Sequence, residues 1–278
     1  MTGRRLLRPA VVVLVAVVVA GLGLWLQVGE RLAIDTRYTA GGEANPDRVD
    51  VEASVQRVDA AGRELILRVL VTPRGRLGED GEVSPTEDLV LQTSSSVRGD
   101  LTYRAHARIT TVDLPVALTD GAITDYPFDR YRATIAFAGS AGGRAVPVRM
   151  TLSNNDALFT PHVRASEEGG VPEFELRVDR SGSVLIFAVL MMAAMWTLAV
   201  AVVIGTWFLV TRRRGLVWPA LGWMAATLFA LAAFRNTAPG SPPIGSLLDY
   251  LAFLWVETVI AVCVIVTVVA GARAEPRT

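Results

Sequence analysis

The residue with the clearest potential for chemistry is Glu257, an acid within a long apolar stretch near the C-terminus. An ionised acid deep in a bilayer costs about 2.5–3.5 kcal/mol on insertion scales, so it usually has a partner. Asp249, Phe253 and Glu257 are spaced four apart, which predicts one shared helix face, and Arg235 is the candidate partner. Glu257 is interpreted either as part of a proton or cation path or as a group that locks helix packing. The second interpretation is favoured, because a single acid is too little for a relay.

A Tyr-Pro-Phe-Asp corner is the second candidate site, and it stands just before the alternating run of residues 131–138. Further along, residues 235–249 read "RNTAPGSPPIGSLLD", a segment stiffened by prolines because each fixes φ. We expect the corner to press on this segment and Asp129 to pair with Arg235. The predicted coupling interface consists of Tyr126, Pro127, Phe128, Asp129, Arg235, Pro239, Pro242 and Pro243.

Three other groups of residues are weaker candidates for chemistry. The acidic loop of residues 78–88 has the oxygen ligands that Ca²⁺ prefers, but not the spacing of a known calcium loop. The hydroxyls of residues 93–96 have no histidine arranged nearby, and His106 is interpreted as an ordinary strand residue. The single cysteine, Cys263, excludes a disulfide framework. We therefore expect no catalytic residue, no metal site and no cofactor, although an envelope enzyme acting through Glu257 or the acidic loop remains a third hypothesis.

The elements that must position these residues include four apolar stretches, in a chain that is 51% hydrophobic. Each is long enough to cross a bilayer, whose hydrocarbon core takes roughly 20 residues of helix. They are residues 9–26, 183–210, 216–234 and 250–270. Three arginine clusters flank them: Arg4, Arg5 and Arg8; Arg212, Arg213 and Arg214; and Arg273 and Arg277. All four stretches satisfy the positive-inside rule if the three clusters lie in the cytoplasm.

This orientation predicts a multi-pass protein of the cell membrane with both termini inside. Residues 1–8, 211–215 and 271–278 are then cytoplasmic, whereas residues 27–182 and 235–249 are external. The first stretch also fits a cleaved signal peptide, with "VVA" as the cleavage site. Its apolar run continues through "LGLWL", which favours an uncleaved anchor.

The external segment, residues 27–182, has the pattern of a β-rich domain. Residues 49–58 alternate apolar and polar, and residues 64–71 return after the turn "AAGR", which predicts a hairpin. Further strands are expected at residues 89–93, 101–112, 131–138, 146–152 and 174–178. The fold class is therefore an integral membrane α+β protein with an N-terminal transmembrane anchor, an external antiparallel β-sandwich and three C-terminal transmembrane helices. The external segment holds 18 Arg against 24 Asp and Glu, which argues against binding nucleic acid.

Two resemblances bear on function. The run "YPFDRYRATIAF" resembles a motif of pentameric ligand-gated channel subunits, with Tyr131 where that family usually has Gln. The resemblance implies a corner at the foot of a β-sandwich that presses on the loop between the second and third following helices. Unlike channel subunits, this chain has an anchor before the domain and no fourth helix after it.

Over nearly its whole length, the chain resembles an actinobacterial membrane-protein family known as domain of unknown function 4436. The shared features are the anchor, "YPFD", the "RRR" turn, "RNTAPGSPPIG" and "D…F.W.E" in the last stretch. This resemblance implies an architecture and a cell-envelope setting, and no activity. The leading hypothesis is a non-enzymatic binding or scaffolding protein with an envelope partner or a homo-oligomeric state. The alternative is a channel-like or signal-coupling oligomer.

Overall fold

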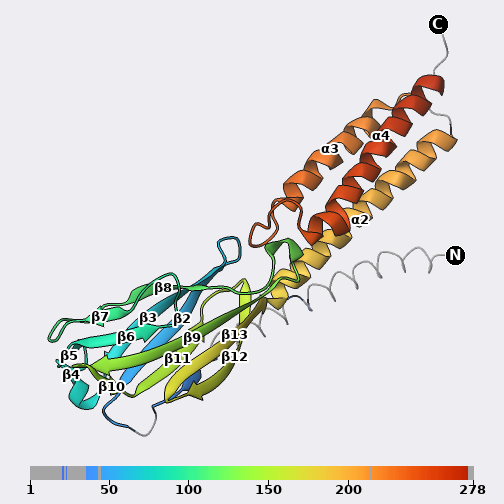
Figure 1. Ribbon diagram of the computed structural model, residues 1–278. Helices are drawn as coiled ribbons and strands as arrows, with labels where there is room; N and C mark the ends of the chain where they lie inside the picture. The colour runs from blue at the N-terminus through green and yellow to red at the C-terminus, as the bar shows by residue number, and fades with distance from the viewer. Residues whose placement is uncertain (1–20, 22, 24–35, 43–44, 213–214, 275–278) are drawn as a thin grey trace. The chain divides into compact units, whose positions relative to one another are not determined.

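A computed structural model of the chain describes residues 21, 23, 36–42, 45–212 and 215–274 (Figure 1). The chain divides into two compact units. The β unit comprises Met1–Ala122 and Asp129–Ser183, and the helical unit comprises Ile123–Phe128 and Val184–Thr278. The predicted anchor, residues 9–26, lies outside the described residues apart from Gly21 and Gly23, which are helical.

The β unit contains two large sheets, drawn as arrows in Figure 1. The first has the strand order β1-β11-β2-β3-β8, with β1 at Tyr38–Ala40, β2 at Val49–Asp59, β3 at Glu64–Pro73, β8 at Val112–Ala117 and β11 at Val148–Asn154. The second has the order β12-β13-β9-β6-β7, with β10 paired to β9. Its strands are β6 at Leu89–Thr93, β7 at Leu101–Tyr103, β9 at Arg130–Ala141, β10 at Arg144–Val146, β12 at Phe159–Glu168 and β13 at Val171–Arg180. A small hairpin joins β4 (Gly78–Glu79) to β5 (Ser84–Pro85).

The core of the β unit follows from the alternation in its strands. In β2 every second residue from Val49 to Val55 is buried, and in β9 Tyr131, Ala133, Ile135 and Phe137 are buried. Successive side chains of a strand point to opposite faces, so each sheet has one apolar face. Contacts of β9 with both β8 and β11 join the two sheets. The prediction of a β-rich domain is confirmed.

Three details of the predicted strands are wrong, and β1, β4, β5 and most of β8 were not predicted. Strand β11 pairs with β2 in parallel, so the sheets are not purely antiparallel. The predicted strand at residues 101–112 is broken, because residues 104–111 form a turn and loop in which His106 has φ +62°. Strand β12 was missed because it contains Pro161 and several charges, which are tolerated here because β12 is an edge strand.

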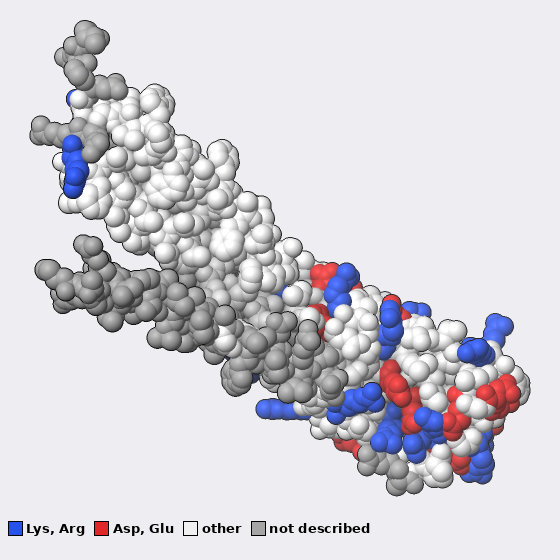
Figure 2. Space-filling model, turned by 180° about the vertical axis from the view of Figure 1, so that it is seen from behind, with Lys and Arg blue, Asp and Glu red and all other residues white. Residues whose placement is uncertain are grey.

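The helical unit contains α2 (Gly182–Thr211), α3 (Trp218–Arg235), a π-helix (Asp249–Phe253) and α4 (Leu254–Ala274). Two helices, Gly182–Thr211 and Asp249–Ala274, are long and apolar enough to cross a membrane. Large apolar side chains such as Phe208, Ile265 and Phe229 are exposed along the helices. In Figure 2 charged side chains gather over the β unit, whereas the helices show an almost uncharged face. The helix α3 is shorter and ends in Arg235, and its role as a third span stays a prediction.

Candidate functional site

The loop between α3 and the π-helix is organised by an ion pair that closes its two ends. Arg235, the last residue of α3, donates from Nε and Nη2 to the two carboxylate oxygens of Asp249, each at 2.8 Å. Asp249 is the first residue of the π-helix, and the two side chains are only 8% and 2% exposed. A bidentate arginine–carboxylate pair is among the strongest hydrogen-bonded arrangements in proteins. By joining Arg235 to Asp249, this ion pair holds the two ends of the loop of residues 236–248 together.

Backbone groups of the same loop satisfy the rest of this ion pair. Arg235 also donates to the carbonyl oxygens of Pro242 at 3.0 Å and Pro243 at 2.9 Å. The N–H of Gly245 donates to Asp249 Oδ2 at 2.7 Å, from a backbone with φ +91° that favours glycine. The prolines therefore contribute carbonyl acceptors as well as stiffness. Pro239 takes no part in holding the guanidinium.

The Tyr-Pro-Phe part of the predicted corner belongs to the helical unit and packs beside this loop. Tyr126 is fully buried, and its carbonyl oxygen accepts a hydrogen bond from the N–H of Leu248 at 3.3 Å. Leu248 is also fully buried and directly precedes Asp249. The Tyr126–Pro127 peptide bond is cis, Pro127 is buried, and Phe128 is 48% exposed. The structure thus brings Tyr126 and the end of the loop together.

Asp129, the last residue of the corner, has a different set of partners within the β unit. Arg180 at the end of β13 donates to its carboxylate from Nε at 3.0 Å and from Nη2 at 2.9 Å, and the Tyr131 hydroxyl donates to it at 2.9 Å. The Arg180 guanidinium also lies 4.1 Å from the centre of the Phe159 ring, a cation–π contact. The predicted pairing of Asp129 with Arg235 is therefore wrong. Each charge is neutralised by a partner that lies in its own unit.

Arg180 was missed from the sequence, although its position carries a signal. It is a charged residue immediately before an apolar stretch and at the end of an alternating strand. Its partner Asp129 follows directly after residues 123–128, the segment that joins the helical unit. The Asp129–Arg180 pair therefore joins two points of the β unit from which the chain continues into the helical unit.

Glu257 does not have the partner expected of it, since Arg235 is engaged by Asp249. The carboxylate of Glu257 is half-buried and forms no hydrogen bond or ion pair with any described residue. The buried stripe of this helix runs from Asp249 through Ala252 and Val256, whereas Phe253 and Glu257 are half-buried. Residues 249–253 form a π-helix, in which a spacing of four falls short of a full turn.

The weaker candidates are occupied by structural contacts. In the acidic loop Glu79 contacts the His106 ring at 2.6 Å, Glu82 pairs with Arg74, and Glu87 pairs with Arg144. The Ser94 hydroxyl donates to the Thr134 carbonyl at 2.9 Å. Within the described residues there is no group of three or more potential metal ligands. These contacts give the acids and hydroxyls roles in joining loops and strands.

The fold and site together define a class of protein: a β-rich domain followed by helices, two of which are apolar enough to span a membrane. Residues 39–179 match the family described as Domain of unknown function (DUF4436), and the chain belongs to that family. Residues 180–274 match a second family, described as Domain of unknown function (DUF8686). The boundary between the two matches falls at the end of β13. No curated protein matches the chain.

Proposed function

We propose that this chain is a non-enzymatic membrane protein of the cell envelope. Its β unit lies outside the cytoplasm and binds or scaffolds another envelope component, and its helical unit holds it in the membrane. The exposed apolar side chains of α2 and α4 support the membrane setting, because acyl chains would cover them at no cost. The arginine clusters support an orientation with both termini inside and α3 and residues 9–26 as further spans. The engagement of the acidic and hydroxyl candidates in structural contacts favours binding over catalysis.

The observation that carries this proposal is the placement of the hexapeptide Ile123–Phe128. It lies between β8 and β9 in sequence, yet it packs with the helical unit through Tyr126 and Leu248. The hexapeptide is covalently continuous with β9. A displacement of that strand would therefore move Tyr126 and, through its hydrogen bond with Leu248, the loop whose ends Arg235 and Asp249 join. We infer that the hexapeptide couples a binding event on the β unit to the helices. Such a coupling needs an element with two arrangements, which the loop of residues 236–248 would supply.

Hydrogen exchange of the full chain in lipid nanodiscs tests the coupling. The substitution Arg180→Met perturbs the β unit, and we expect it to raise amide exchange in residues 236–249 about threefold or more. In a Tyr126→Ala background the same substitution should leave this loop unchanged, because the fully buried ring that packs the hexapeptide into the helical unit is gone. Thr124→Ala, an exposed change in the same hexapeptide, is the matched control and should preserve the effect. If Arg180→Met leaves the amide exchange of residues 236–249 unchanged in every background, the proposed coupling is wrong.

Cysteine labelling in intact cells tests the orientation separately. The native Cys263 is buried and is first replaced by Ala. A membrane-impermeant maleimide should then label Ser241→Cys from outside, and Thr211→Cys only after permeabilisation. The reverse pattern would place the loop in the cytoplasm and end the proposal of an external β unit.

A channel-like oligomer is the second candidate function. The docking of Tyr126 beside the α3–α4 loop favours it, because the resemblance to channel subunits implies pressure on the corresponding loop. Reconstitution into liposomes with an ion-flux assay separates the two candidates. Flux that is lost in Tyr126→Ala and kept in Thr124→Ala would support the channel. A monomeric protein that conducts no ions would exclude the channel and leave the scaffolding protein as the proposed function.

A further inference from the structure

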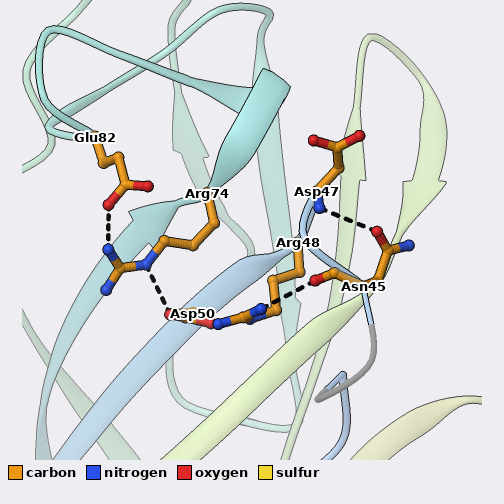
Figure 3. Close-up of polar contacts among 6 residues, drawn as sticks. All are labelled: Asn45, Asp47, Arg48, Asp50, Arg74 and Glu82. Atoms are coloured by element: carbon orange, nitrogen blue, oxygen red, sulfur yellow. Dashed lines mark hydrogen bonds and ion pairs between the residues drawn. The ribbon is translucent and has the colours of Figure 1, made fainter.

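The loop between α3 and the π-helix, residues 236–248, carries no charged side chain. None of its residues is Asp, Glu, Lys, Arg or His, and the two charges at its ends, Arg235 and Asp249, are buried against each other. In the loop that follows β3, by contrast, Arg74 is partly exposed and binds two carboxylates (Figure 3). The loop of residues 236–248 therefore presents only uncharged groups to its surroundings.

The exposed residues divide this loop into a polar half and an apolar half. In the first half they are Asn236, Thr237, Gly240 and Ser241. In the second half they are Pro243, Ile244 and Leu247, which we call the apolar tip. Ile244 is 90% exposed, the highest fraction among the described large apolar residues. An exposed apolar patch beside polar residues indicates a contact with a membrane or with another protein.

The backbone around the apolar tip has its hydrogen-bond partners inside the loop. Pro242 and Pro243 have no N–H, and their carbonyl oxygens accept hydrogen bonds from Arg235. The N–H of Gly245 donates to the Asp249 carboxylate at 2.7 Å, and the next N–H along the chain donates to the same carboxylate at 3.3 Å. Irregular backbone at the depth of a membrane requires such internal partners. Transfer of the tip from water into lipid would leave these backbone groups satisfied.

The apolar tip continues onto the exposed surface of the helix that follows it. Leu247 is already helical, and the apolar span begins at Asp249. The next exposed large residues along this helix include Tyr250, Leu251 and Trp255, which follow Leu247 at helical spacings. Tyrosine and tryptophan are enriched where a membrane protein crosses the boundary between lipid and water. This continuity favours lipid over a protein partner, because lipid would also cover the exposed side of the span.

We propose that the apolar tip inserts into the interfacial layer at the outer face of the bilayer. Ile244 lies at its apex, and the polar half of the loop, residues 236–241, stays in water. The insertion takes its free energy from the removal of apolar surface from water, and it needs no lipid charge because the loop has none. Leu248 in the same loop bonds to Tyr126, so the lipid would steady the contact that couples the two units. The inference rests on the proposed membrane setting and names the surface that this loop contacts.

Fluorescence quenching of the full chain in phosphatidylcholine nanodiscs tests the insertion. In a Cys263→Ala background, an NBD fluorophore is attached to Ile244→Cys in the tip or to Thr237→Cys in the polar half, which is the matched control. Lipid with a nitroxide near the headgroup end of its acyl chain should quench the label at 244 about twofold or more, because an inserted apolar surface lies near that depth. Iodide in the buffer should quench it little, and the label at 237 should show the reverse pattern. Ile265→Cys, an exposed position on α4, should be quenched by a nitroxide deeper in the acyl chain.

A charge placed in the tip gives a second measurement, with the label moved to Leu247→Cys. Ile244→Lys should lower the quenching of this label by lipid about twofold or more, because a charged group resists transfer out of water. Ser241→Lys adds the same charge in the polar half of the loop and should leave the quenching unchanged. Equal effects of the two lysines would contradict an inserted tip.

The quenching pattern also separates the loop from the membrane setting. If iodide quenches the labels at both 244 and 237 while lipid quenches the label at 265, the whole loop lies in water and the inference is wrong, whereas the membrane setting stands. If the label at 244 is protected from both quenchers, protein covers the tip and the inference is again wrong. Crosslinking of Ile244→Cys between two chains would then identify a second copy as the cover. Absence of lipid quenching at 265 would contradict the membrane setting itself, and the inserted tip with it.

Discussion

Among the described residues, each unit contains one buried arginine–aspartate pair, and the surroundings of the two pairs differ. In the β unit the pair Asp129–Arg180 is supported by side chains, a tyrosine hydroxyl and the face of Phe159. In the helical unit the pair Arg235–Asp249 is supported by the backbone, through proline carbonyls and loop N–H groups. The first pair joins two strands that the sheet already holds by its ladder. The second pair organises a loop that has no ladder of its own.

This difference predicts which part of the protein loses stability when each pair is broken. Replacing a buried ion pair as a whole can be nearly neutral, but removing one partner leaves an uncompensated charge. In the β unit, the loss of stability should centre on β9 and β13, because the rest of the sheet keeps its bonds, and the helical unit should respond only through faster exchange of its loop at residues 236–249. In the helical unit, the loop of residues 236–248 loses the contacts that define its path.

Arg235→Ala should therefore give the largest effect on the helical unit. We expect a loss of about 3–5 kcal/mol in the free energy of unfolding, because Asp249 keeps its charge in a buried site. Tryptophan fluorescence in a denaturing detergent titration reports mainly this unit, since five of the six tryptophans lie in it and the sixth is Trp25. Asn236→Ala, the exposed neighbouring residue, is the control and should stay within about 0.5 kcal/mol of the wild type.

Asp129→Ala should also produce a loss of about 3–5 kcal/mol, in the unfolding free energy of the β unit, whereas in the helical unit only the local amide exchange of residues 236–249 should rise. Hydrogen exchange of β9 and β13 should rise, while the fluorescence transition of the helices stays in place. Arg177→Ala, which changes an exposed arginine on β13, supplies the control. A fluorescence transition that shifted as much for Asp129→Ala as for Arg235→Ala would show that the two pairs do not act locally.

Double-mutant cycles measure the next largest expected effect, which is the coupling energy within each pair. Arg235 with Asp249, and Arg180 with Asp129, should each show a coupling energy of about 0.5–3 kcal/mol. Asp129 with Arg235 should be additive within about 0.5 kcal/mol, because each has its own partner. Strong coupling between Asp129 and Arg235 would restore the pairing expected from the sequence.

These pairs also show how far sequence reasoning reaches. The alternation of residues 49–58 and the exact bounds of β6 followed from period and turn residues, because a half-buried strand must alternate. The apolar stretches at 183–210 and 250–270 lie within α2 and the helix that ends in α4. Composition alone defines such segments.

The partners of Asp129 and Arg235 could not be found in the same way. Several acids and arginines were within plausible reach, and sequence distance does not rank them. Asp249 was named as an intramembrane acid, yet its N–H donors depend on the turn at Gly245. The parallel pairing of β11 with β2 joins strands that lie far apart in the sequence. The alternation of apolar and polar residues in a strand does not specify whether it pairs in parallel or antiparallel.

Glu257→Gln tests the contrast between a paired and an unpaired acid. Glu257 has no partner among the described residues, so the substitution breaks no described ion pair or hydrogen bond. We expect the fluorescence-detected unfolding free energy to stay within about 0.5 kcal/mol of the wild type. Asp249→Asn, an equally small change, should be clearly destabilising because it weakens the bidentate pair with Arg235. Equal losses in the two variants would mean that Glu257 is engaged as well.

The smallest effect is expected from an exposed pair, Arg68 with Asp113, which extends the comparison to the surface of the β unit. Arg68 donates to Asp113 at 3.0 Å, and this hydrogen bond lowers the pKa of Asp113 below its ordinary value of about 3.9. A carboxylate with a lowered pKa in the folded state stabilises the fold above the unfolded pKa, and this contribution is lost as the pH falls. Hydrogen exchange of β3 and β8 should therefore rise slightly as the pH drops below about 3.9 and through the lowered pKa of the folded state. After correction for intrinsic exchange, Asp113→Asn should remove this part of the pH dependence. An unchanged profile in that variant would show that the Arg68–Asp113 pair contributes nothing, as many exposed ion pairs do.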